Sequence, residues 1–173
     1  DIAAFFERPT FDANFLLALM TKYQASPEVL FQRFNLLARD FDLPKVFFLR
    51  LIHDLETYTF EIDKELHLNR RHQPHASGLN ERYCRRWLSI GLLRELQAAR
   101  SLHDKPPALL SGAQRATFLN TGDEYLCLAV AKMGFPSLVR NVSVTIGILL
   151  DDQARQTIRF HDDPNIPRRT VNV

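Results

Sequence analysis

The chain has 173 residues, a formal net charge of +2, and 46% hydrophobic residues. This length suits one domain, or one domain with a small helical attachment, and the apolar content can supply a sizeable core. The small net charge excludes a general polyanion binder, so any contact with nucleic acid or phosphate has to come from local clusters of basic residues.

The two cysteines, Cys84 and Cys127, are too few for a disulfide framework and favour a reducing, cytoplasmic setting. Cys127 stands in an apolar stretch and is predicted to be a buried small hydrophobe. No apolar run reaches the ~18 residues that span a bilayer, so we expect no membrane partner. The sequence shows no signal peptide and begins with Asp1, so we expect a piece of a longer protein.

The pattern first predicts two helices within residues 11–41. Apolar residues recur at three- and four-residue steps across 11–24, and a second helix restarts at Ser26, an N-cap followed by Pro27. This pair resembles a helix-turn-helix. Bulky phenylalanines in the second helix favour a packing role, and direct DNA binding through residues 11–41 stays an alternative. The polar residues that such a helix would offer to DNA are Gln32, Arg33, Asn35 and Arg39.

The remainder predicts an α+β unit with a mainly antiparallel sheet. Residues 45–53 and 58–66 are typical of strands and flank residues that favour a turn, so they predict a hairpin. Asn80 is expected to cap a helix over about 81–100. Further strands are expected near 115–119, at 125–132 and at 142–150, and 157–160 is expected to complete a final hairpin or a strand–helix return. The prolines at 164 and 167 are expected to end regular structure. The predicted organisation is a helical connector at 1–43 and a sheet domain at 44–173.

The segment from Glu65 to Trp87 carries three histidines, five arginines and one cysteine between two stretches that are typical of core. A site for an anion, a metal or a redox cofactor needs such a composition, whereas a solvated loop does not. The side chains that could bind a metal are His67, His72, His75 and Cys84. Their spacing is loose, and no second thiolate or nearby carboxylate completes a zinc motif. The alternative is a loop whose histidines cap backbone groups.

Arginines are the stronger candidates, because guanidinium groups bind phosphates bidentately and stay charged. Arg82 and Arg86 fall one turn apart near a helix N-terminus, where backbone amides also favour anions, and Trp87 beside them could stack on a base. The alternative, equally open, is that the arginines form surface salt bridges. The acidic partners would be Glu65, Glu81 and Asp162. The predicted ligand-binding residues are Arg70, Arg71, His72, His75, Arg82, Arg86, Trp87, Arg168 and Arg169.

Catalytic motifs are not found in the sequence. It has no metalloprotease helix motif, no nucleophile elbow, no phosphate-binding glycine loop and no dinucleotide fingerprint, and its six glycines leave little room for a nucleotide loop. We therefore expect a protein that is not an enzyme.

Three strings carry a family resemblance: 26–37, the pair 64–71 and 83–87, and 158–172. Together they resemble the C-terminal part of bacterial transcription regulators that have an Xre-type helix-turn-helix, an ImmA/IrrE-like middle domain and a C-terminal sensor region. The short-chain fatty acyl-CoA regulator family is among them. The Pro-Arg-Arg-x-Val-Asn end is the most specific part of the resemblance, and the Ser-Pro-Glu helix is the least specific.

This resemblance implies a GAF-like sensor domain after a helical connector, in a cytoplasmic homodimer that binds DNA through a domain missing from this chain. It implies an acyl-CoA or related effector and, in some members, an iron–sulfur cluster whose cysteines follow the Val-Asn segment. Cys84 could add to such a cluster, although one thiolate cannot hold it alone. An iron–sulfur or metal redox sensor therefore stays a further alternative.

On this basis we expect the effector-sensing portion of a transcription regulator, in which ligand binding shifts the helical connector. Phosphates would be held by Arg70, Arg71 and Arg86. The acyl or base slot would be lined by Phe48, Phe60 and Trp87.

Overall fold

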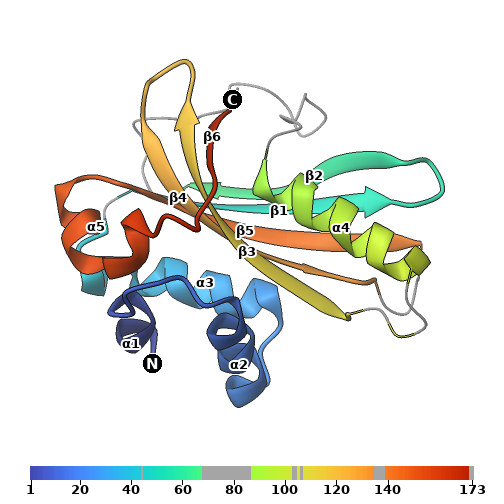
Figure 1. Ribbon diagram of the computed structural model, residues 1–173, viewed down its shortest axis with the longest axis horizontal. Coiled ribbons are helices and arrows are strands. Elements are labelled where there is room, and N and C mark those ends of the chain that lie inside the picture. The colour runs from blue at the N-terminus through green and yellow to red at the C-terminus, as the bar shows by residue number, and fades with distance from the viewer. Residues whose placement is uncertain (44, 68–86, 103–104, 106, 135–138, 172–173) are drawn as a thin grey trace.

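The computed structural model of the chain describes residues 1–43, 45–67, 87–102, 105, 107–134 and 139–171; of Arg39, Leu66 and His67 it describes the backbone alone. The described residues form one mixed α+β body, a curled sheet with helices on both faces (Figure 1). The helices are α1 (Ile2–Phe6), α2 (Ala13–Tyr23), α3 (Pro27–Leu37), α4 (Leu88–Leu102) and α5 (Asp152–Thr157), with 3₁₀ turns at Ala38–Phe41 and Arg159–Asp162.

The sheet has six strands in the order β2-β1-β5-β4-β3-β6 within the described part of the chain. Their bounds are β1 (Val46–Asp54), β2 (Thr59–His67), β3 (Leu109–Phe118), β4 (Glu124–Lys132), β5 (Arg140–Leu149) and β6 (Arg168–Val171). Every neighbouring pair is antiparallel except β3 and β6, which run parallel. The predicted α+β class with a mainly antiparallel sheet is therefore confirmed, as is the β1–β2 hairpin.

The helix pair begins as the sequence predicts, but α3 ends at Leu37, and the expected stretch to residue 41 is a 3₁₀ turn. Asp12 caps α2 by accepting from the backbone N–H groups of Asn14 and Phe15, and Gln24 ends the helix in the left-handed region with φ 48°. The hydroxyl of Ser26 then caps α3. Because both caps are local, this part of the fold is readable from sequence.

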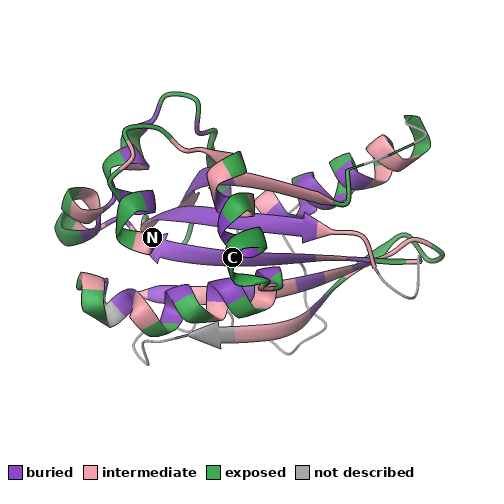
Figure 2. Ribbon diagram, turned by 90° about the horizontal axis from the view of Figure 1, so that it is seen from below, coloured by how far each residue is buried: buried purple, intermediate pink, exposed green. Residues whose placement is uncertain are grey.

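One face of the sheet, the helix face, is covered by α1, α2, α3 and α5. Its core is rich in phenylalanine, with ring centroids of Phe5 and Phe160 5.0 Å apart and those of Phe5 and Phe15 stacked at 5.8 Å. Figure 2 shows the buried strands between the helices. Helices α1 to α3 share this core with the sheet, and the division into a connector and a sensor domain stays a prediction.

The opposite face, the α4 face, is covered by α4. Strand β1 contributes side chains to both faces, with Val46 and Phe48 on the helix face and Leu49 and Leu51 on the α4 face. This alternation follows from the two-residue period of a strand. No helix of the described residues is long and apolar enough to cross a membrane.

The C-terminal region differs from the sequence expectation in two ways. Residues 157–160 do not form a strand, because Asp151 caps a short helix, and Ile158 and Phe160 reach the core from the turn that follows. Regular structure also does not end at Pro167. Strand β6 follows it as an edge strand, a place where a preceding proline costs no ladder hydrogen bond.

Candidate ligand-binding site

Most of the predicted ligand residues lie outside the described residues. These are Arg70, Arg71, His72, His75, Arg82 and Arg86, together with the predicted metal residue Cys84. The structure does describe Trp87, Arg168 and Arg169. Trp87 ends the 65–87 segment, and Arg168 and Arg169 stand in β6.

Trp87 lines a small pocket between the start of α4 and the sheet, with a volume of about 30 Å³. This α4 pocket has apolar walls from Leu49, Trp87, Leu88, Ala116, Phe118, Cys127 and Val171, and polar groups from Ser89, Gln114 and Thr145. A volume of this size matches the share of one water molecule or one methyl group. The described walls therefore admit the end of a ligand.

Gln114 is the most informative residue of the α4 pocket. It stands in β3, is 6% exposed and lines the α4 pocket. The amide can both donate and accept, which suits a carbonyl or an amide of a ligand.

Ser89 and Thr145 connect α4 to the sheet at the same place. Their hydroxyl groups form a buried hydrogen bond between the first turn of α4 and the central strand β5. This bond fixes the start of the helix above the pocket. The position of Trp87, one residue before the helix, is therefore coupled to β5.

Cys127 lies opposite Gln114 in the β3–β4 register and also lines the α4 pocket. Burial raises the pKa of its thiol to about 12, so the group stays protonated at neutral pH. A protonated thiol is neither a nucleophile nor a metal ligand. This agrees with the predicted role of Cys127 as a buried hydrophobe.

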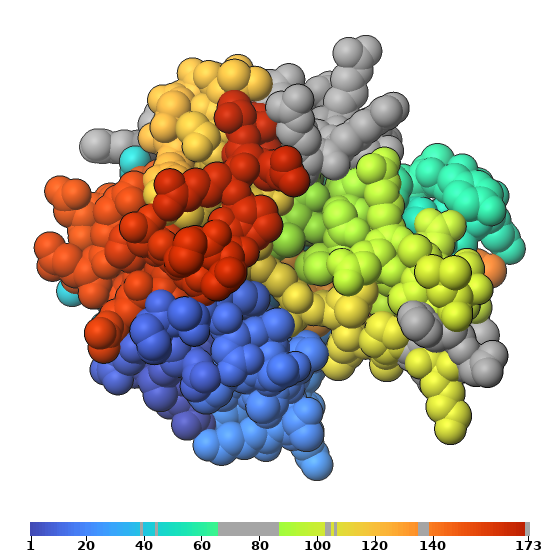
Figure 3. Space-filling view, viewed as in Figure 1, coloured from blue at the N-terminus to red at the C-terminus, as the bar shows by residue number. Residues whose placement is uncertain are grey.

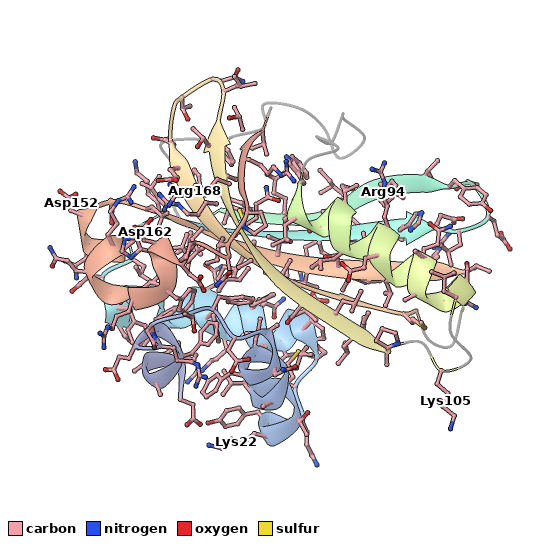
Figure 4. The ribbon with its side chains drawn as sticks, in the orientation of Figure 1. Lys22, Arg94, Lys105, Asp152, Asp162 and Arg168 are labelled. Carbon is pink, nitrogen blue, oxygen red and sulfur yellow. The ribbon has the colours of Figure 1, made fainter. Side chains whose placement is uncertain are left out.

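Arg168 is engaged in an ion pair. Its guanidinium lies 2.7 Å from Asp162, which also accepts from Arg115 at 2.6 Å (Figure 4). Arg115 in turn binds Glu124, which accepts from Arg155 at 2.8 Å. For Arg168 the structure therefore shows the salt-bridge alternative, with the predicted partner Asp162.

Arg169 is differently placed. It pairs with Ala116 across the β3–β6 ladder and shares a face of β6 with Val171; Ala116 and Val171 both line the α4 pocket. Arg169 is exposed, and no ion pair joins it to another described residue. Figure 3 shows the C-terminal segment, in red, beside the start of α4, in green. Arg169 is thus the described cation best placed to meet an anionic ligand there.

The predicted apolar slot is divided by the sheet. Phe48 is fully buried on the helix face, whereas Phe60 and Trp87 pack on the α4 face. Phe48 therefore cannot line one slot with Trp87. The error arises because residues of one strand alternate between faces, and the sequence did not show which face the ligand would use.

The helix pair carries a larger groove of about 510 Å³ between α1, α2 and α3. It is mostly apolar, with Leu19, Tyr23, Val29 and Leu30 in its wall and Arg33 beside them. Of the polar residues that the sequence offered to DNA, Asn35 is buried and Gln32 donates to Glu28 at 3.3 Å. The side chain of Arg39 lies outside the described residues.

Among the described residues no group of three His, Cys, Asp or Glu side chains could hold a metal ion. Cys127 is the described cysteine, and it is buried. Comparison of the chain with protein-family models, with curated proteins and with solved structures finds no match.

Sequence reasoning did not select Gln114, Ser89 or Thr145. The signal available was the alternation of β5, in which Asn141, Ser143 and Thr145 interrupt an apolar run. Such alternation normally indicates a solvent-facing side, and α4 covers that side here.

Proposed function

We propose that this chain is the effector-sensing portion of a transcription regulator. It binds an anionic metabolite such as an acyl-CoA on the α4 face and relays binding to a DNA-binding domain outside this chain. The observation that carries the proposal is the amide side chain of Gln114 in the mostly apolar wall of the α4 pocket. The mixed α+β architecture supports a GAF-like sensor domain, and the earlier resemblance supports a cytoplasmic homodimer.

In this proposal, polar and charged side chains at the edge of the α4 pocket orient the ligand. Its thioester or amide carbonyl accepts from Gln114, and its short apolar end fills the volume of about 30 Å³ under Trp87. Arg169 on β6 attracts the phosphates. Because the described pocket has room for about one methyl group, short acyl chains are expected to bind better than long ones.

The relay passes through β3 and the sheet. Strand β3 directs Gln114 toward α4 and Ser111 toward α2, and the Ser111 hydroxyl donates to the Ala13 carbonyl at 3.1 Å. On the same face, at the β2 edge of the sheet, Lys64 holds Glu28 of α3 at 2.7 Å. A ligand that binds one arrangement of β3 more tightly shifts the helix pair toward that arrangement.

Calorimetry tests the ligand claim. The full-length protein, with its N- and C-terminal flanking segments, is titrated with coenzyme A and with acetyl-, butyryl- and octanoyl-CoA. We expect heat with the short acyl forms and at least about tenfold weaker binding in Gln114→Met, since one lost hydrogen bond to a ligand carbonyl costs about 1.4 kcal/mol. The matched control is Gln156→Met on the exposed side of α5. Absence of heat with every acyl-CoA would exclude this ligand class.

Direct DNA binding through residues 11–41 is the second proposal. It has less support, because Asn35 is buried and Glu28 places a negative charge in the first turn of α3. A steep salt dependence of DNA affinity that weakens in Arg33→Ala would favour it.

An iron–sulfur redox sensor is the third proposal. It needs thiolates other than Cys127, and Cys84 lies outside the described residues. Visible absorbance of the anaerobically purified protein, lost in Cys84→Ser, would favour it.

A further inference from the structure

A second group of buried polar side chains lies on the α4 face, farther along β5. It consists of His53 from β1 and of Asn141 and Ser143 from β5, and each is at most 2% exposed. His53 and Asn141 stand directly opposite each other in the β1–β5 register. Ser143 follows two residues later on the same face, within diagonal reach of His53. These three residues are termed the polar cluster.

The polar cluster has an unusual number of unpaired atoms. Nδ1 of His53, both amide atoms of Asn141 and Oγ of Ser143 are buried without a hydrogen-bond partner. One such atom is tolerated in many proteins, but four in adjacent side chains would cost a large part of the stability of a domain of this size. Their concentration at one place indicates a site that is built to receive hydrogen bonds from another molecule.

The chemistry of the polar cluster is neutral. Burial, and then the positive charge of Arg94, lower the pKa of His53, so its imidazole is uncharged at neutral pH. Its ring stacks on Phe60 at 4.1 Å, which holds it against β2. The neighbouring carboxylate of Asp54 is used elsewhere, since it caps the turn at Glu56 and Thr57.

The hydrogen-bond donors and acceptors of the polar cluster determine which chemical group it can bind. Asn141 offers two N–H donors and one acceptor, Ser143 offers a hydroxyl, and His53 offers one ring nitrogen whose role depends on the tautomer. No carboxylate or second nitrogen ligand stands in the cluster, which argues against a divalent cation. No cationic group lies within it to hold an anion. A neutral group that both donates and accepts hydrogen bonds, such as a carboxamide or a urea, fits this set.

We propose that His53, Asn141 and Ser143 form a second binding site, separate from the α4 pocket, for a neutral small molecule that carries a carboxamide or urea group. This site is independent of the proposed acyl-CoA function. It lies on the same central strand as Thr145 of the α4 pocket, with Ser143 two residues and Asn141 four residues, or about 13 Å, from Thr145.

The test uses acetamide as the probe, with ¹⁵N-labelled full chain observed by NMR. Acetate and acetone are matched probes, because acetate has the same shape with a charge and acetone can accept but not donate. We expect acetamide at millimolar concentration to shift the Asn141 side-chain amide and the backbone amides of the cluster saturably. Acetate and acetone should require at least about tenfold higher concentration.

Two variants keep the test decisive. Asn141→Leu should abolish the acetamide shifts, and Ser143→Ala, which removes a single hydroxyl, should weaken binding about threefold or more. The control Asn120→Leu changes an exposed asparagine of the same type. The proposal is overturned if acetamide gives no saturable shift, if both cluster variants respond like the native chain, or if the cluster binds ordered water that acetamide does not displace.

Discussion

The two faces of the sheet differ in what they bury. The helix face is filled mainly by aliphatic and aromatic side chains, including closely packed phenylalanines, and it also buries Asn35 and Arg115. The α4 face buries polar side chains as well, and atoms of His53, Asn141 and Ser143 have no hydrogen-bond partner within the described residues. A protein needs the first kind of face for stability. The second kind reduces stability, and the ligand sites proposed above would account for its retention.

The largest expected effect tests the helix face. Phe160 is fully buried and packs on Phe5 and Phe11. Phe160→Ala should lower the free energy of unfolding by about 3–5 kcal/mol, because it leaves a cavity in a tightly packed cluster. Denaturant unfolding at constant m-value measures this change. The control Leu36→Ala, at an exposed position, should change it by less than about 0.5 kcal/mol. A loss below 1 kcal/mol in Phe160→Ala would contradict the assigned role of this face.

The second prediction concerns Arg115, a buried cation on the helix face that pairs with two carboxylates. Arg115→Met removes the guanidinium that binds Glu124 and Asp162. We expect a loss of about 2–3 kcal/mol at pH 7, less than for a fully buried pair because Asp162 is exposed and Glu124 keeps Arg155.

The pH dependence of this variant has a definite sign. Hydrogen bonding from Arg115 is the largest cause that lowers the pKa of Glu124 below its ordinary value of 4.5. A lowered carboxyl pKa contributes stability above the unfolded-state pKa, and this contribution is lost as pH falls through the lower folded-state pKa. The stability difference between native chain and Arg115→Met should therefore narrow below pH 4.5. A difference that widens on acidification would contradict the assignment.

The third prediction tests packing on the α4 face. Gly147 stands opposite Phe47 in the β1–β5 register, and a Cβ atom there would overlap the Phe47 ring. Gly147→Ala should cost about 1–2 kcal/mol, at the low end for overpacking because Phe47 is only half-buried and its ring can turn. Thermal unfolding of Gly147→Ala with and without Phe47→Leu checks this. The smaller side chain should recover most of the loss, and failure to do so would implicate the strand backbone instead.

The smallest expected effect distinguishes the two faces most directly. Gln114→Met replaces a buried amide by an apolar side chain of similar shape, and it should leave the free energy of unfolding unchanged or raise it by up to about 1 kcal/mol. The same denaturant titration measures it. A loss of more than about 1 kcal/mol in the free energy of unfolding would mean that the amide has a structural partner. Gln114 would then no longer support ligand binding in the α4 pocket.

The parts of the fold that were predicted from sequence depend on local chemistry. Ser26 and Pro27 begin α3, and the hairpin β1–β2 follows from alternation and turn residues. The structure of residues 157–160 was harder to predict. Ile158 and Phe160 are both buried, and either a strand or a 3₁₀ turn can bury two residues at this spacing. Strand β6 was missed because its pairing with β3 is a long-range contact, which a proline-rich sequence pattern does not reveal.

The sequence by itself determined the elements, the apolar content and the α+β class, because caps, turns and periodicity act over a few residues. Only the tertiary structure decided which side chains meet. It placed α4 over the polar side of β5, assigned Arg168 to Asp162, and separated Phe48 from Trp87 by the thickness of the sheet. The physical reason is that a strand presents two faces to its surroundings, and the choice of what covers each face is made by residues far away in the chain.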